Sequence, residues 1–185
     1  MHTNSADIIA TLVVLKREIE YHSKTKMKLT IAGGGEAHLL AKELGAANVG
    51  VILNPVRPFP VNWESRRIHP GPPLTEESQI LRLLDQNVTV GVGVLESWDA
   101  QNARFDLGWV AVEAGDRISK ERALMLGSVN VVKLLGGVGD DLEEAGVVRS
   151  VLEGELVATA GGDLLEFGSK VVAVVSSRRG FVDVF

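Results

Sequence analysis

The sequence predicts an α/β fold in which helices cover a parallel β-sheet and a small β module follows. Before Gly137, apolar β-branched runs alternate three times with stretches of helical spacing, and each connection is long enough for a parallel crossover. After Gly137 the helical spacing gives way to short apolar runs separated by glycine-rich turns. We therefore expect two parts, residues 1–137 around the parallel sheet and residues 138–185 in the β module.

Length and composition further limit the fold class and the functions that this chain can have. The 185 residues suffice for one substantial core, but a complete (β/α)8 barrel needs about 250. The absence of cysteine excludes disulfides, thiolate metal sites and a cysteine nucleophile. A net charge of -5 argues against nucleic acid or an anionic membrane as partner. The apolar runs are too short to span a membrane and no signal peptide is evident, so a cytoplasmic protein is expected.

The first element is expected to be a helix over about residues 5–22. Ser5 or Asp7 can cap its N-terminus, since their side chains accept hydrogen bonds from free backbone N–H groups. Four apolar residues at helical spacing are predicted to face the core: Ile8, Leu12, Leu15 and Ile19.

Three buried strands are predicted over residues 28–32, 49–53 and 88–94. Between them, residues 36–44 have helical spacing, and Thr75 is expected to cap a second helix that turns Ile80 and Leu83 inward.

Two further helices are predicted over residues 103–114 and 119–135, the second capped by Ser119 and ended by two glycines. The closing β module is expected to have strands at residues 156–159, 171–175 and 181–184.

Ligands of parallel α/β sheets bind at the carboxyl ends of the strands, so three loops are candidates: residues 33–36, 54–74 and 95–104. In the first loop, Gly33, Gly34 and Gly35 can offer N–H groups to a phosphate. As a dinucleotide fingerprint the loop fails, because His38 occupies the position of the third glycine. The alternative is a tight turn that packs the helix on the strand.

Two histidines near these loops have more than one interpretation. His38 follows Glu36 and is either a metal ligand or a hydrogen-bonded packing residue. His2 precedes the first helix, where the end of an upstream strand would lie.

The second loop holds all six prolines of the chain, and its length is unusual unless it binds or covers something. Arg57, Arg66 and Arg67 are candidates to bind an anionic group of a substrate, and Trp63 to wall an apolar pocket. Alternatively, the arginines bind the loop's own carbonyl groups and a neighbouring carboxylate.

The third loop offers Glu96, Asp99, Asn102 and Arg104. A carboxylate at the end of a barrel strand is a usual general base or metal ligand, which favours Glu96 as catalytic residue. Asn102 is a candidate for substrate binding, and Asp99 is expected to cap the following helix.

Together, several segments resemble the carboxyl-terminal half of an amidohydrolase. They are GGGEAHLLAKEL, PGPPLT, VTVGVG, NARFDLGW, ISKERAL, SVNVVKLLG and GELVATAGGDLLEF. The resemblance covers nearly the whole chain. It is to the imidazolonepropionase-like group, and within it to a fungal branch labelled carbohydrate esterase family 9 or N-acetylglucosamine-6-phosphate deacetylase-like. It implies the second half of a (β/α)8 barrel followed by a segment of a composite β-sandwich.

The resemblance also implies chemistry. Such proteins hydrolyse C–N or ester bonds with water activated by a divalent metal, commonly zinc. His2 corresponds to a metal ligand of the fifth barrel strand. Leu95 stands where the family has an aspartate, and Glu96 lies one residue further along. No His-x-His pair occurs in the sequence, so this chain lacks most of the metal ligands.

Two functions are therefore open. The first is a metal-dependent hydrolase acting on a small-molecule substrate, with this chain alone inactive. The second is a non-catalytic half-barrel that binds a small molecule or associates with itself. Because a half-barrel exposes two sheet edges, we also expect a homo-oligomer, most simply a homodimer.

Overall fold

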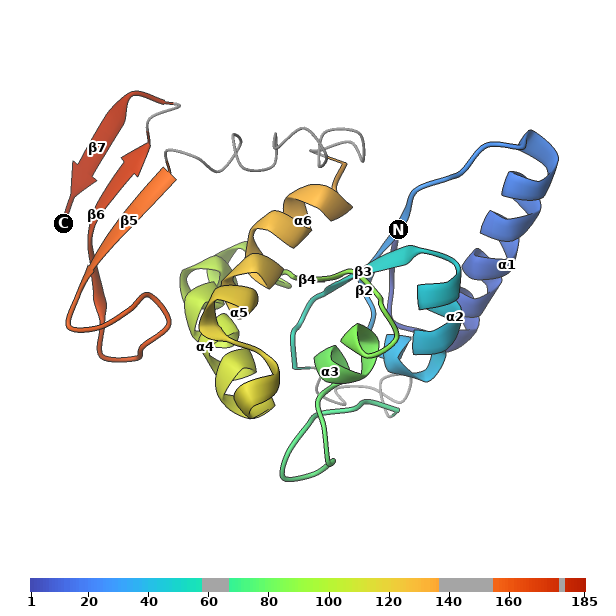
Figure 1. The fold of residues 1–185 in the computed structure, drawn as a ribbon, viewed down its shortest axis with the longest axis horizontal. Coiled ribbons are helices and arrows are strands. Elements are labelled where there is room, and N and C mark those ends of the chain that lie inside the picture. Colours follow the sequence, from blue (N-terminus) through green and yellow to red (C-terminus); the bar gives the residue numbers. More distant parts are fainter. Residues whose placement is uncertain (58–66, 137–154, 177–178) are drawn as a thin grey trace.

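The computed structural model describes residues 1–57, 67–136, 155–176 and 179–185. These residues form a four-stranded parallel sheet with its helices and, near the C-terminus, a three-stranded antiparallel sheet (Figure 1). The α/β class and the parallel sheet predicted from the sequence are thus confirmed.

The strands of the parallel sheet lie side by side in chain order. They are β1 (His2–Thr3), β2 (Leu29–Gly33), β3 (Val49–Leu53) and β4 (Val90–Val92). Consecutive strands pair directly, for example Ile31 with Val51 and Val51 with Val90. Since every crossover steps in the same direction, β1 and β4 are the two edges of the described sheet.

Short helices connect and follow these strands. In chain order they are α1 (Ala6–Ser23), η1 (Ala37–Leu40), α2 (Ala41–Ala46), α3 (Gln79–Leu84), η3 (Ser97–Asn102), α4 (Ala103–Ala114), η4 (Gly115–Arg117), α5 (Lys120–Gly127) and α6 (Val129–Leu134). Within the described residues, no helix combines the length and apolar character needed to cross a bilayer.

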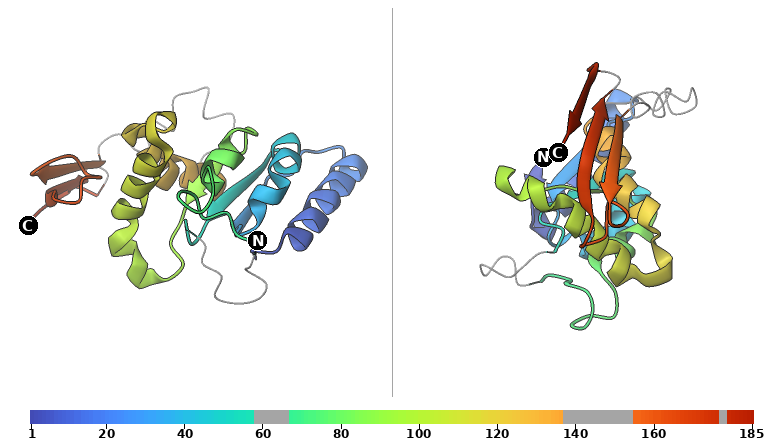
Figure 2. Two further views of the ribbon diagram at one scale, coloured as in Figure 1. Left: turned by 90° about the horizontal axis from the view of Figure 1, so that it is seen from below. Right: turned by 90° about the vertical axis from the view of Figure 1, so that its left-hand side faces the viewer.

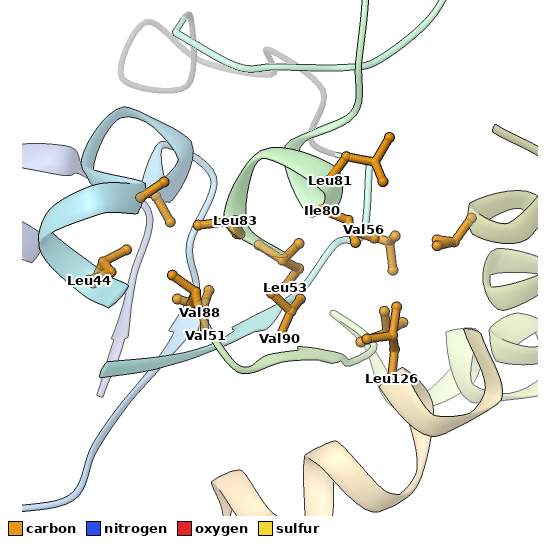
Figure 3. Packing of buried hydrophobic residues seen from close by; sticks show 14 of the residues in the cluster. Leu44, Val51, Leu53, Val56, Ile80, Leu81, Leu83, Val88, Val90 and Leu126 are labelled. Atoms are coloured by element: carbon orange, nitrogen blue, oxygen red, sulfur yellow. The ribbon is translucent and has the colours of Figure 1, made fainter. Parts of the chain in front are cut away.

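The core lies between one face of the sheet and these helices. Val51, Leu53 and Val90 project from the strands toward Leu83 of α3 and Leu126 of α5 (Figure 3). All five side chains are less than 2% exposed, as expected for strands that helices cover.

Helix α6 covers the opposite face of the sheet. Oγ1 of Thr30 donates a hydrogen bond to the carbonyl of Leu134 at 2.7 Å, and Nδ2 of Asn130 donates to the carbonyl of Val90 at 2.7 Å. A Cβ at Gly50 would overlap the Leu134 side chain, so the glycine allows the close approach of this helix. The sequence predicted a single helix over residues 119–135, but the chain breaks at Ser128 so that α6 can cross to this face.

Helix α1 forms where predicted but packs through a different face. Of the four residues expected inside, Leu12 packs in part against the core, but Ile8, Leu15 and Ile19 are 47%, 47% and 40% exposed. The helix instead buries Ala6, Ile9, Val13 and Lys16 against the sheet. The predicted and the observed inner residues both have helical spacing. Which of the two faces of α1 is buried depends on the elements that pack against the helix.

Two predicted helix caps are also corrected. Thr75 does not cap α3, because its Oγ1 accepts from the Gly71 N–H and donates to the Glu77 carbonyl. Ser78 is the N-cap of α3. Asp99 lies inside η3, and α4 begins after Asn102, whose side chain makes no capping hydrogen bond. The predicted helix over residues 36–44 is divided between η1 and α2.

The antiparallel sheet contains β5 (Glu155–Ala160), β6 (Lys170–Ser176) and β7 (Phe181–Val184). Its β5–β6 connection packs on the helical part, where Leu165 is 7% exposed and belongs to the core. Arg104 of α4 donates to the carbonyl of Ser169 at 2.9 Å, and Lys120 of α5 is paired with Asp163. The two parts are thus joined by both core packing and polar contacts.

Candidate functional site

The carboxyl ends of the four parallel strands lie at one edge of the sheet and bring the three candidate loops together. The structure describes the turn after β2, the loop after β3 up to Arg57 and from Arg67 onward, and the η3 segment after β4. This edge is where parallel α/β sheets bind ligands.

The glycine turn after β2 does not offer a phosphate cradle. Its three N–H groups are already bonded, Gly33 to Oδ1 of Asn54, Gly34 to the Thr3 carbonyl at 2.8 Å and Gly35 to Oδ1 of Asn4 at 3.1 Å. Gly33 and Gly34 have φ of +96° and +67°, which other residues rarely adopt. The structural interpretation of these glycines therefore holds, and the asparagines at two strand ends serve to fix the turn.

Glu36, directly after the turn, is a buried carboxylate at 2% exposure. Its oxygens accept two hydrogen bonds from Arg67, at 2.9 Å and 2.7 Å, and one from the backbone N–H of Ala6 at 2.9 Å. Burial on its own would raise the pKa of Glu36, but these bonds outweigh it and lower the pKa. The carboxylate is thus held charged, where it satisfies the first turn of α1 and ties the arginine loop to the sheet.

A pair of histidines lies beside this carboxylate. The rings of His38 and His69 stack with centroids 5.0 Å apart, and His38 is 6% exposed. Burial, with the nearby His69 and Arg82, lowers the pKa of His38 to about 4, and burial also lowers the pKa of His69. Within the part of the chain that the structure describes, Nδ1 of His38 and Nε2 of His69 are buried without a hydrogen-bond partner. The lowered pKa values favour the neutral form of both rings, and among the described residues the stacked pair is not joined by a third metal-binding side chain.

A hollow of about 250 Å³ opens between the ends of β3 and β4. It is lined by Pro55, Val56, Arg57, Gly93, Val94, Leu95, Asp99 and Asp106. Nη2 of Arg57 lies 3.0 Å from Oδ1 of Asp106, and its guanidinium stacks 4.5 Å from the centre of the Trp109 ring. Asp99 has no side-chain partner among the described residues, which leaves the hollow with one unneutralised carboxylate.

The residues predicted to form the site do not all lie together in the structure. Arg57 lines the hollow, whereas the guanidinium of Arg67 binds Glu36. Glu96 and Asn102 are exposed, and His2 is exposed on β1. Trp63 and Arg66 lie outside the described residues. The structure thus places one predicted substrate-binding residue, Arg57, in a defined hollow.

The described residues do not fit a metal ion. Among them, no three His, Asp or Glu side chains come close enough together to hold one. His2 on β1 and Glu96 after β4 belong to opposite edges of the described sheet, and neither is part of the group of at least three protein ligands that a zinc site requires.

Sequence reasoning missed several residues that shape this edge. The sequence pattern draws attention to Glu36 only as a neighbour of His38, and it does not single out Asp106 within the helix predicted over residues 103–114. The available signal for Glu36 is its position directly after a glycine turn. A residue at such a position precedes a helix, and its carboxylate can accept hydrogen bonds from the free N–H groups of a helix N-terminus. Nothing local marks Gln79, whose side chain donates to the Gly34 carbonyl across 45 residues of sequence.

Comparisons with known proteins find a relative in sequence and a similar solved structure. The chain is 37% identical over 150 residues to "Amidohydrolase tasK" of Hapsidospora irregularis, a match that covers 72% of this chain and 15% of that protein. The fold is similar to a crystal structure of an amidohydrolase from Thermotoga maritima MSB8, with a TM-score of 0.65 and 20% identity. That match covers 95% of this chain and 41% of the other. No family profile matches the sequence.

Proposed function

This chain is related over part of its length to the amidohydrolase superfamily, and we propose that it forms the second half of an amidohydrolase-type (β/α)8 barrel. The half-barrel would be followed by a segment of a composite β-sandwich. The order of the described sheet supports this proposal, because strands wound in one direction build a closed barrel when four more are added.

The associated activity would be hydrolysis of a C–N or ester bond in a small molecule. In this chain we assign the substrate-binding share of that function to the hollow at the ends of β3 and β4. The observation that carries this assignment is the position of the hollow at the carboxyl ends of two parallel strands, with Arg57, Asp99 and Asp106 on its wall.

The charges of the hollow indicate the kind of substrate. Arg57 is neutralised by Asp106, and Asp99 has no side-chain partner among the described residues. An amide with a cationic group would therefore be favoured over an anionic one.

Binding of three N-acetyl amino acid amides tests the assignment, with lysine, glutamate and alanine side chains. We expect the lysine derivative to bind most tightly and to shift the NMR signals of Gly93 and Val94. Asp99→Asn should weaken its binding about 10-fold, and the matched variant Asp116→Asn should not. Equal affinity for all three amides, or shifts elsewhere, would overturn the assignment.

A non-catalytic half-barrel is the second candidate. It is favoured by Leu95, which stands where the resemblance implies a catalytic aspartate, and by the described residues, among which no three potential metal ligands lie close together. Zinc content measured by mass spectrometry after dialysis, together with hydrolysis of p-nitrophenyl acetate, separates the two candidates. We expect the purified chain to hold far less than stoichiometric zinc and to be inactive alone. Stoichiometric zinc with zinc-dependent hydrolysis would show that this chain carries a complete site.

A further inference from the structure

A second hollow lies at the amino ends of β2 and β3, at the opposite end of these strands from the candidate substrate hollow. It measures about 470 Å³ and is formed by the second half of α1, the connection from α1 to β2, and the end of α2 with the residues that lead into β3. Helices α1 and α2 lie side by side at the β1 end of the sheet, which brings these segments together (Figure 2).

The lining of this hollow is basic. It carries Lys16, Arg17, Lys26 and Lys28 against the single carboxylate of Glu20, so its formal charge is +3, whereas that of the whole chain is -5. Arg17 and Lys26 are exposed, and within the described ranges neither side chain forms a hydrogen bond or a salt bridge. Because like charges held near one another repel, an anion that binds among them lowers the energy of the site.

The dipole of α1 does not account for Lys16 and Arg17. A helix C-terminus favours cations in its last turn, where the positive charge lies beside the free carbonyl groups. The basic residue in the last turn of α1 is His22, and Lys16 and Arg17 precede that turn. Their position therefore points to a partner in the hollow.

Lys16 is the buried cation of the hollow, with a side chain that is 4% exposed. Its Nζ lies 2.6 Å from Oε1 of Glu20, and the same oxygen accepts from the backbone N–H of Met27 at 2.8 Å. These bonds lower the pKa of Glu20 and hold its carboxylate charged. An ammonium group has three N–H donors, and among the described residues only Glu20 accepts from Lys16. Since an unpaired buried donor is costly, the other N–H groups favour an oxyanion in the hollow.

We propose that this basic hollow binds a small organic phosphate. A phosphate monoester carries about two negative charges at neutral pH, which suits a lining of +3 better than the single charge of a carboxylate does. The guanidinium of Arg17 can bind two phosphate oxygens at once, and the ammonium groups of Lys16 and Lys26 can bind a third.

The rest of the hollow suits the uncharged part of such a ligand. Met27, Ala46 and Ala47 supply apolar surface, and the volume falls within the usual range of small-molecule sites, about 300–1,000 Å³. A free phosphate ester is favoured over a lipid headgroup, because the net charge of -5 opposes approach to an anionic membrane. The proposal does not depend on the half-barrel or on its activity.

Calorimetric titration with phenyl phosphate at pH 8 tests the proposal, with inorganic phosphate and benzoate as comparison probes. We expect phenyl phosphate to bind most tightly, since inorganic phosphate lacks the apolar part and benzoate carries one charge. Its binding should shift the NMR signals of Met27 and Ala47 and leave those of Gly93 and Val94 unchanged. Equal affinity for the three probes, or shifts confined to Gly93 and Val94, would overturn the assignment.

Arg17→Gln with Lys26→Gln should weaken the binding of phenyl phosphate at least about 10-fold. Both side chains are exposed, so the variant should fold, and circular dichroism verifies this. The matched control is Arg122→Gln with Lys170→Gln, which removes the same charge from exposed positions outside the hollow. Equal weakening in the control would show that the charge of the whole chain, and not the hollow, attracts the anion.

The buried ammonium is tested with Lys16→Met and Glu20→Gln combined. This variant keeps the apolar stem of residue 16 and leaves no carboxylate without its counter-ion, so the fold should persist. We expect the binding of phenyl phosphate to weaken at least about 10-fold here also. Unchanged binding in a variant with the wild-type circular dichroism spectrum would refute the role of Lys16.

Vesicles of phosphatidylglycerol distinguish a free phosphate from a lipid headgroup. We expect the chain not to sediment with them. Sedimentation that Arg17→Gln with Lys26→Gln abolishes would overturn the assignment to a free small molecule. Failure of the lysine amide to bind would leave this result unchanged, because the two hollows have no lining residue in common.

Discussion

Glu36 and Arg67 show how the burial of one partner decides how much an ion pair contributes to the stability of the fold. Arg67 and Arg57 are similarly exposed, at 46% and 43% of the side chain. Their partners differ, since the Glu36 side chain is 2% exposed and that of Asp106 is 30% exposed. Removing Arg67 would leave a charge in the interior without its counter-ion, whereas removing Arg57 exposes a carboxylate that water already reaches.

We therefore predict that Arg67→Ala lowers the midpoint of urea unfolding clearly more than Arg57→Ala does. Glu36→Gln should cost about 1–2 kcal/mol, because the Ala6 N–H keeps an acceptor while the charge-assisted bonds are lost. The double variant Glu36→Gln with Arg67→Ala should be less destabilised than the sum of the single variants. Equal effects of the two arginine variants would show that Glu36 is solvated in the folded protein.

His38 predicts a pH dependence of stability. Burial lowers its pKa from 6.5 to about 4, so below pH 6.5 the unfolded chain binds a proton that the folded chain does not. The free energy of unfolding should therefore have its full value above pH 6.5. It should fall as the pH drops toward 4, by up to about 3 kcal/mol. Urea unfolding at half-unit pH steps measures this slope.

The comparison variant is His38→Gln, which should flatten the curve between pH 6.5 and pH 4. Glu36, Glu77, His69 and Arg82 also face this region. The pKa of Glu36 is lowered from 4.5, so its own contribution to stability is lost only as the pH falls below about 5, at the acid end of this range. His69→Gln should remove a smaller part of the slope, since His69 is less buried. An unchanged slope in His38→Gln would assign the pH dependence to other groups.

At the scale of single residues, the sequence predicts which side chains can make ionic or polar contacts. It does not predict which partners those side chains contact. The sequence makes Arg67 a candidate to bind a substrate anion, yet its guanidinium pairs with Glu36, which is 31 residues away. A tight turn that packs a helix on a strand is one of the two interpretations that the sequence leaves open for the three glycines, and it is the one observed; the positive φ that the turn needs is a local property that glycine supplies. The pairing of Arg67 depends on how two loops meet, and no local pattern encodes that.

Among the elements, α6 depends on contacts across the sheet. Its Leu134 side chain lies over Gly50 and Gly91, where a Cβ would meet it. We predict that Leu134→Ala destabilises the protein by about 1–2 kcal/mol, since it leaves a void over both glycines. Leu135→Ala is the matched control, because the neighbouring leucine is 72% exposed and its truncation should cost less than about 0.5 kcal/mol. Equal losses in thermal unfolding would show that α6 does not pack on this face.

The elements also show why strands were easier to predict than helix faces. The strand at Val49–Leu53 is buried on both sides, so a continuous apolar run identifies it. Helix α1 carries two apolar stripes, and periodicity alone does not select between Ile8 and Ile9 as the inner residue. The choice follows from the sheet on one side and the open edge on the other, both of which are tertiary properties.

In the whole molecule, the antiparallel sheet is part of the same folding unit as the helices. Leu165, from the β5–β6 connection, is 7% exposed within the common core, and Arg104 of α4 bonds to the Ser169 carbonyl. A single cooperative transition is expected when a segment shares its core with the rest of the chain.

We predict that Leu165→Ala lowers the free energy of unfolding by about 2–3 kcal/mol, through the cavity it leaves beside Gly108. Hydrogen exchange should then protect β5, β6 and β7 less than α4, because the variant loosens the contact that couples the sheet to the helices. Leu156→Ala, at a position 64% exposed on β5, should change neither quantity appreciably. The measurements belong at one protein concentration, since association would add to the stability of every variant. Unchanged unfolding of Leu165→Ala would show that the antiparallel sheet folds on its own and that its contact with α4 contributes little.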